Sequence, residues 1–176
     1  MVTSEFRFDV PDGFYDAGSD VRDAAQLHAP GAVLAFLLAA APAAAAGGAE
    51  VRASIAISRI DSGPIPPGAV AAYLSNVELA DASDLSAVRP ISVGGQSGQV
   101  ITYGHLIGGG GAGVAARSDD LVVTSAGASY EIVLDCAATE FTIRDAAFHR
   151  LLASWQWPEP SPVATPPRPA SSAIRE

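Results

Sequence analysis

Hydrophobic and polar residues alternate with a period of two in several parts of the chain, as in strands that bury one face. The first such part, 5–10, ends at the turn-forming residues Pro11, Asp12 and Gly13. The run 32–38 is uniformly apolar, which predicts a strand buried on both sides and leaves a buried helix as the alternative. The other predicted strands are 51–58, 88–93, 99–107, the pair 114–117 and 121–124, and 130–136.

Two segments carry hydrophobic residues at helical spacing. Pro66 and Pro67 suit the first turn of a helix whose apolar face would comprise Val70, Tyr73, Leu74 and Val77. Thr142 and Asp145 have the spacing of a capping box. The helix that this box predicts would present one apolar face made of Phe148, Leu151, Leu152 and Trp155.

The connections between the strands from 88 to 136 are short, which favours an antiparallel meander. With two helices added, the pattern predicts an α+β fold. We expect one domain over 1–157, with an Ala/Gly-rich loop at 41–48. Residues 158–176 are rich in Pro, Ser and Ala and lack large apolar side chains, which predicts a disordered tail.

The composition narrows the classes of partner. The chain has 176 residues, of which 49% are hydrophobic, and its net charge is −9 with no lysine. This acidity argues against nucleic acid and against an anionic membrane surface, since both need a basic patch. The uncharged stretch 29–49 is broken by Pro30, Gly31 and Pro42, which argues against a membrane span. Its acidic upstream flank is unlike that of a signal peptide, so we expect a cytoplasmic location.

Several residues invite a chemical interpretation that the pattern around them does not support. Cys136 is the single cysteine and lies on the apolar side of its strand, as a buried small hydrophobe would. The glycine run 108–113 has no lysine and precedes a predicted strand, so it favours a hairpin loop over a phosphate loop. Ser97 misses the spacing of a hydrolase nucleophile elbow by one position.

The acidic residues and histidines lack ligand spacing. His28, His105 and His149 have no ligand-type partner on a shared helical or strand face. Asp119 and Asp120, and the group Asp16, Asp20 and Asp23, are interpreted as turn residues and solvated faces because calcium-loop spacing is missing. We therefore predict no catalytic, metal-binding or cofactor-binding residue and no cofactor.

Trp155 and Trp157 are the candidates for partner binding. In an extended segment the two rings lie on one face, since residues i and i+2 of a strand point the same way. They either pack into the core against the last helix or form an exposed aromatic strip for a partner, and the sequence leaves both open.

The order of these elements resembles the PsbP/DcrB-like superfamily, which includes LpqN-type lipoproteins and a Ran-binding protein. The likeness covers most of residues 4–157. The residues that carry it are 6–13, 98–103, 121–134 and 141–157, the last with Phe148, Leu151, Leu152, Ser154, Trp155 and Trp157. The resemblance implies an αβα sandwich around a central antiparallel β-sheet.

The resemblance also implies a role as an adaptor, since members serve photosystem assembly, bind a small GTPase, act as bacterial lipoproteins or chaperone secreted effectors. They share a scaffold and not a reaction. We therefore expect a non-enzymatic adaptor or chaperone that binds a protein or hydrophobic peptide on one sheet face. The alternative is a small-molecule or lipid-binding protein whose ligand fills space left by alanines under the sheet. An enzyme ranks third, and the sequence does not fix the oligomeric state.

Overall fold

The computed structural model describes residues 1–18, 31–41, 43–44, 50–76, 82–107 and 113–158. Its main sheet has seven strands in the order β1-β2-β5-β9-β8-β7-β6, each antiparallel to its neighbours. The predicted antiparallel meander is therefore confirmed. The strands are β1 (Phe14–Asp16), β2 (Gly31–Ala39), β5 (Ser54–Ile60), β6 (Arg89–Val93), β7 (Gln96–Ile107), β8 (Val114–Ser125) and β9 (Ala128–Ala137).

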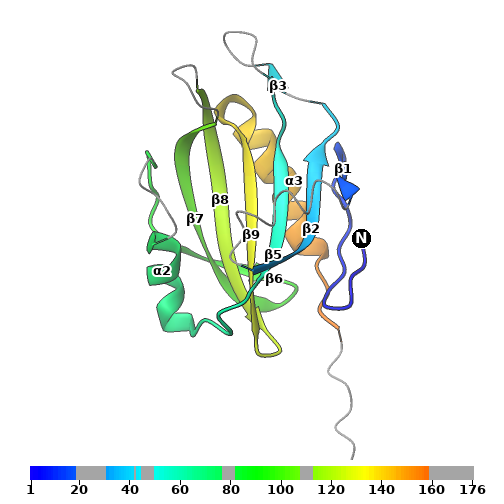
Figure 1. Ribbon diagram of the computed structural model, residues 1–176, viewed down its shortest axis with the longest axis vertical. Helices are drawn as coiled ribbons and strands as arrows, with labels where there is room; N and C mark the ends of the chain where they lie inside the picture. The colour runs from blue at the N-terminus through cyan, green and yellow to red at the C-terminus, as the bar shows by residue number, and fades with distance from the viewer. Residues whose placement is uncertain (19–30, 42, 45–49, 77–81, 108–112, 159–176) are drawn as a thin grey trace, which may run out of the picture.

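Two helices pack on opposite faces of this sheet. Helix α2 (Pro67–Asn76) clusters with Ile101 and Val122, whereas α3 (Phe141–Ser154) clusters with Val100 and Leu121. Successive residues of a strand point to opposite faces, so the two helices lie on different sides. Figure 1 shows α3 behind the strands and α2 beside β7. The predicted αβα sandwich is confirmed, and we call its two sides the α3 face and the α2 face.

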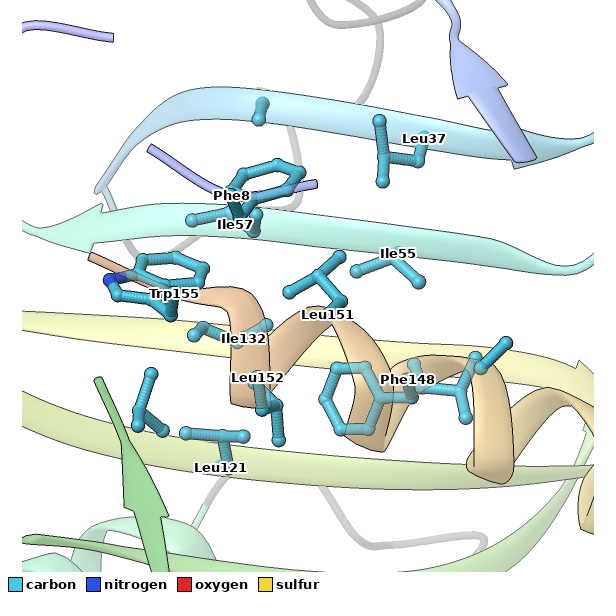
Figure 2. Packing of buried hydrophobic residues seen from close by; sticks show 14 of the residues in the cluster. Phe8, Leu37, Ile55, Ile57, Leu121, Ile132, Phe148, Leu151, Leu152 and Trp155 are labelled. Carbon is cyan, nitrogen blue, oxygen red and sulfur yellow. The ribbon is translucent and has the colours of Figure 1, made fainter. Parts of the chain in front are cut away.

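The α3 face holds the main core. The predicted apolar face of the last helix is buried throughout, and Phe148 and Leu151 have no exposed surface. Figure 2 shows these side chains over Ile55, Ile57 and Ile132 of the sheet. Each large side chain buried in this way contributes on the order of 2 kcal/mol of transfer free energy. This layer therefore stabilises the fold and fixes the position of α3.

The N-terminal segment differs from its prediction. Residues 5–10 form no strand of the sheet, and Arg7 makes only isolated bridges to Val2 and Gln156. The alternation still has its expected effect, because Phe6 and Phe8 are each 3% exposed. The Phe8 ring stacks on Trp155 at a centroid distance of 5.3 Å, and the Phe6 ring lies tilted against Trp155 at 4.4 Å. Side-chain packing thus replaces sheet pairing for this segment.

Two further expectations are wrong. The predicted pair of strands, 114–117 and 121–124, is the single strand β8. The capping box is not formed, because α3 begins at Phe141 and its N-cap residue Glu140 makes no side-chain cap hydrogen bond. Glu140 instead pairs with Arg144 at 2.9 Å, one turn further along the helix.

The Ala/Gly-rich segment 41–48 is partly paired. β3 (Ala43–Ala44) forms a small separate ladder with β4 (Glu50–Val51). The remaining residues of the proposed loop, 42 and 45–48, lie outside the described residues, as do 159–176 of the proposed tail. The helix α2 begins at Pro67 as predicted and buries Val70 and Leu74.

Candidate binding face

Part of the α2 face is apolar and only half-buried. We call it the open face: Tyr15 on β1, Phe36 and Leu38 on β2, Ala56 on β5, and Val133 on β9. Register places Tyr15 opposite Leu38, and Phe36 opposite Ala56, which in turn lies opposite Val133. None of these five residues belongs to a buried core cluster of the described chain, and Tyr15 is 41% exposed. The open face is therefore a continuous apolar surface across four strands.

The open face explains why the run 32–38 is uniformly apolar. β2 is a strand, as predicted, but its burial alternates along its length. Ala35 and Leu37 are completely buried on the α3 face, whereas Phe36 and Leu38 are half-buried on the α2 face. The expectation that both faces of this strand are buried is therefore only half right. Apolar side chains on both faces of a strand with one open side indicate a surface for another molecule.

Three carboxyl groups border the open face. We call Asp135, Asp120 and Glu131 the carboxyl line, because they occupy three consecutive cross-strand rows of the α2 face on β9 and β8. Asp135 shares a row with Ser54, Asp120 with Val133, and Glu131 with Ser58. The line separates the open face from the part of the sheet that α2 covers.

The two inner carboxyl groups are buried without a cation. Asp120 is 1% exposed and Glu131 is 7% exposed. The Tyr73 hydroxyl of α2 donates a hydrogen bond to Glu131 Oε1 at 3.0 Å, whereas Asp120 Oδ1 has no hydrogen-bond partner in the part of the chain that the structure describes. Burial raises the pKa of both carboxyl groups, and the Glu131 charge raises that of Asp120 further. The pair therefore retains a proton at a pH where a solvated carboxyl would have lost it.

The outer carboxyl group has a different partner. His105 Nε2 lies 2.9 Å from Asp135 Oδ1 and 2.9 Å from Ser118 Oγ, and the Ser118 hydroxyl also donates to Asp135. The hydrogen bond to Asp135 raises the pKa of His105 above its usual value, against the opposing effect of burial. Asp135 is thus bound to an imidazole that becomes a cation as the pH falls.

The arginines of the sheet strands all serve the other face. Arg59 pairs with Glu5, Arg89 donates to Thr102, and Arg117 lies over the Phe141 ring at 4.9 Å. Arg52, which precedes β5, donates to the Tyr15 hydroxyl at the rim of the open face. Within the described strands, the α2 face therefore combines three carboxyl groups with one histidine and no arginine.

A second polar region lies between α3 and the edge of the sheet. Arg89, Thr102 and Asp119 are joined by hydrogen bonds, and His149 lies 3.2 Å from Asp145. Burial raises the pKa of Asp119; the Thr102 hydrogen bond opposes this rise and Asp145 adds to it. These groups line an open groove of about 310 Å³ and are largely satisfied by one another. Such a network fits a structural role.

The two tryptophans have different environments. Trp155 is 2% exposed within the main core, so its ring offers no surface to a partner in this conformation. Trp157 is half-buried, and its Nε1 donates to the Val93 carbonyl at 2.9 Å. It borders a shallow pocket of about 320 Å³ together with Val2, Arg7 and Gln156. The exposed pair is not formed, and partner binding through Trp157 stays a prediction.

The remaining candidates are placed as follows. Cys136 is completely buried and burial raises its pKa to about 12, which confirms its interpretation as a small hydrophobe. The interpretation of Asp119 and Asp120 as turn residues is wrong, because both lie in the middle of β8 and are buried. Gly108 to Ala112, His28, Asp20 and Asp23 lie outside the described residues. The described residues contain no cluster of three or more metal-ligating side chains.

The carboxyl line could have been suspected from the sequence. Glu131 and Asp135 interrupt an otherwise apolar alternation at positions i and i+4, which puts both on one side of a strand. Asp120 is immediately followed by Leu121, Val122 and Val123, so it adjoins a run of apolar residues. The register of β8 against β9, which brings the three together, could not be read from the chain, because the pattern assigns Asp119 and Asp120 to a turn.

Comparison with solved structures shows the same fold in proteins of distant sequence. PA94 of Pseudomonas aeruginosa, a protein of unknown function, matches with a TM-score of 0.54 at 19% identity over 72% of this chain and 83% of its own. LpqN of Mycobacterium tuberculosis, involved in cell envelope biogenesis, matches with a TM-score of 0.56 at 17% identity over 87% and 83%. The cyanobacterial PsbP of Synechocystis sp. PCC 6803 matches with a TM-score of 0.50 at 15% identity over 87% and 86%.

These likenesses confirm the PsbP/DcrB-like fold that the resemblance implied, and at such identities they show the fold alone. No model of a known protein family and no curated protein matches the chain. Within the described residues, no helix has the length and apolarity that a membrane crossing requires.

Proposed function

We propose that this chain is a non-enzymatic binding protein, an adaptor or chaperone, which binds a hydrophobic segment of a protein partner on the open face. The observation that carries the proposal is the half-buried apolar surface of Phe36, Leu38, Ala56 and Val133 on strands whose opposite side is completely packed. The part of these large apolar side chains that remains exposed adds nothing to the stability of the folded domain, because it is still in contact with water. Burying that part against a partner lowers the free energy of a complex.

The shape of the surface favours a peptide over a small molecule. The open face extends across four neighbouring strands, which stand about 4.8 Å apart, so it is broad and not a closed pocket. The alternative of a ligand under the sheet requires space beside the small residues of the α3 face. Ala35, Ala39 and Ala53 instead belong to the packed cluster that contains Phe148 and Trp155. That packing favours the protein or peptide partner.

The groove beside α3 is the part of the molecule that most resembles a catalytic site, but its polar groups are engaged with one another. Its titratable groups converge, but Asp119 accepts from Thr102, and Asp145 contacts both Asp119 and His149. The hydroxyl beside Asp119, that of Thr102, also accepts a hydrogen bond from Arg89 and is buried, so both groups are held within the network. A non-enzymatic role is therefore the better proposal for the chain.

The test uses the full chain and a defined probe, a leucine- and alanine-rich peptide fused to a soluble carrier protein. Isothermal titration should show binding with a negative heat-capacity change, the mark of apolar burial. Phe36→Asp should weaken binding by about ten-fold or more, because it places a charge in the apolar contact. Ile143→Asp is the matched control, since Ile143 is an exposed apolar residue on α3. Equal weakening by both substitutions, or no binding by the unsubstituted chain, would overturn the proposal.

A further inference from the structure

We propose that the hydrophobic segment bound on the open face carries a basic side chain, lysine or arginine, that docks on the carboxyl line. This inference rests on the proposed function and adds the chemistry of the partner. It follows from the position of the three carboxyl groups, from what each of them lacks, and from the distribution of the arginines.

The position comes from the strand register. Val133, in the open face, lies directly opposite Asp120 across the β8–β9 pair. Asp135 and Glu131 flank Val133 on the same strand and point to the same side. An apolar segment that contacts Val133 and Phe36 therefore passes within reach of all three carboxyl groups. A basic side chain, with its long apolar stem, suits a site where hydrophobic surface ends at acidic groups.

The second observation is a buried carboxyl oxygen without a hydrogen-bond donor. Asp120 is almost completely buried, and its Oδ1 has no partner among the described residues. Glu131 has one donor, the hydroxyl of Tyr73. A buried carboxyl group left without donors costs free energy. An ammonium or guanidinium group brings three to five donors together with the compensating charge.

Among the described residues, no cation lies beside Asp120 and Glu131. In this part of the chain, Tyr73 from α2 and Tyr103 from β7 face both carboxyl groups, and neither can become a cation. His105 from β7 can, but it is bound to Asp135, and Arg52 donates to the Tyr15 hydroxyl. Arg59, Arg89 and Arg117 lie on the α3 face. The proton held by the pair neutralises charge in the free protein. A basic group of the partner that docks there displaces this proton and neutralises the charge in its place.

The exposed part of the line gives the entry point. The Asp135 side chain is 31% exposed and borders the apolar surface. Tyr73, which covers Glu131, belongs to a helix of ten residues that packs on the sheet through Val70 and Leu74. A basic side chain that approaches along β9 meets Asp135 first and then takes the place of the Tyr73 hydroxyl at Glu131.

The experiment compares three carrier-fused peptides that differ at one central position, Arg, Gln or Glu, titrated against the full chain. The Arg peptide should bind at least about ten-fold more tightly than the Gln peptide, as expected for one charge-assisted hydrogen bond. The Glu peptide should bind most weakly. Titration in buffers of different ionisation enthalpy should show proton release with the Arg peptide and none with the Gln peptide.

The matched variants are Glu131→Gln and Asp120→Asn, which remove charge and keep shape. Each should abolish the preference for Arg, so that the Arg and Gln peptides bind the variant with equal affinity. Asp145→Asn removes the same charge from the α3 side, so it controls for the overall acidity and should preserve the preference. Equal affinity for the Arg and Gln peptides, with the Phe36→Asp effect intact, would overturn this inference and leave the proposed function standing. Loss of all binding would overturn both.

Discussion

The two faces of the sheet are made by the same strands but differ in how they are completed. On the α3 face, apolar residues from seven strands and α3 close into one cluster, and the charged residues at its border pair with one another. On the α2 face, a shorter helix packs mainly on β7 and β8, and the apolar surface over β2, β5 and β9 is half-buried. Two buried carboxyl groups there have no cation among the described residues. The apolar and charged groups of the α3 face pack and pair within the chain. The α2 face keeps half-buried apolar side chains and buried carboxyl groups, which a second molecule would contact.

This difference separates stability from function along a single strand. In β2, Leu37 is completely buried on the α3 face and its neighbour Phe36 is half-buried on the α2 face. The first makes the fold and the second is available for binding. Substitutions on the two faces should therefore have different effects, and the largest should appear where the packing is complete.

The largest effect is expected in the α3 core. Phe148→Ala should lower the free energy of unfolding by about 3–5 kcal/mol, because it leaves a cavity in a packed cluster. Leu38→Ala, on the open face, should lower it by less than about 1 kcal/mol, because its surroundings can still be filled by water. Urea unfolding followed by circular dichroism measures both. A Leu38→Ala loss as large as that of Phe148→Ala would remove the distinction between the faces.

The next effect is the pH dependence of the carboxyl pair. The pKa values of Asp120 and Glu131 are raised in the folded protein, so the folded state holds protons that the unfolded chain releases. Their contribution to stability is complete below about pH 4, the ordinary range of these groups, and is lost as the pH rises through the raised values. Each unit by which a pKa is raised corresponds to about 1.4 kcal/mol.

The double variant Asp120→Asn/Glu131→Gln should therefore lose less stability than the unsubstituted chain between pH 4 and 8. Asp119 on the α3 face keeps its own raised pKa in both proteins, so its contribution cancels in the comparison. Unfolding curves at a series of pH values provide the measurement. Parallel pH profiles for the two proteins would show that the pair has normal pKa values.

A smaller effect is expected at the contact between α2 and the pair. Tyr73→Phe removes the hydroxyl that donates to Glu131 and should cost about 1–2 kcal/mol of unfolding free energy. Combined with Glu131→Gln, it should show a coupling energy in a double-mutant cycle. Tyr103→Phe serves as the control, because Tyr103 lies on the same face and makes no hydrogen bond to Glu131. Additive costs for Tyr73 and Glu131 would mean that this hydrogen bond does not hold the helix.

The smallest effect is expected at His105. Its raised pKa means that its contribution to stability is complete below about pH 6.5 and is lost as the pH rises through the raised value. His105→Asn should therefore cost about 0.5–1 kcal/mol at pH 6, since the pair with Asp135 is partly exposed, and the cost should shrink as the pH rises through the raised pKa. Titration of the imidazole by NMR measures the pKa directly, and a value at or below 6.5 would contradict the assignment.

Much of the fold follows from the sequence, for definite reasons. The apolar spacing that ends at Trp155 predicts α3, because only a helix brings those side chains to one side. The alternation at 130–136 predicts β9 in the same way. The break proposed within β8 fails because two adjacent aspartates are typical of a turn, and the hydrogen bond from Thr102 that lets Asp119 stay buried comes from a neighbouring strand.

The site was less accessible from the sequence. Apolar residues on both sides of β2 gave no sign of which side α3 would cover, since that depends on how the final helix crosses a sheet assembled from distant segments. The i, i+2 spacing of Trp155 and Trp157 predicts two rings on one face as candidates for partner binding, yet Trp155 completes the core. The carboxyl line depends on the register between β8 and β9, which the alternation of residues along each strand does not determine.

The most direct test of the account is to map where a bound apolar peptide lies. A carrier-fused leucine- and alanine-rich peptide with one photoreactive leucine would be irradiated with the full chain, and the adducts located by mass spectrometry. We expect adducts at Phe36, Leu38 and Val133, and few at Ile143, although it is more exposed. Adducts concentrated at Ile143, or around Trp157 and Val2, would contradict the assignment of binding to the open face and would place the partner elsewhere on the molecule.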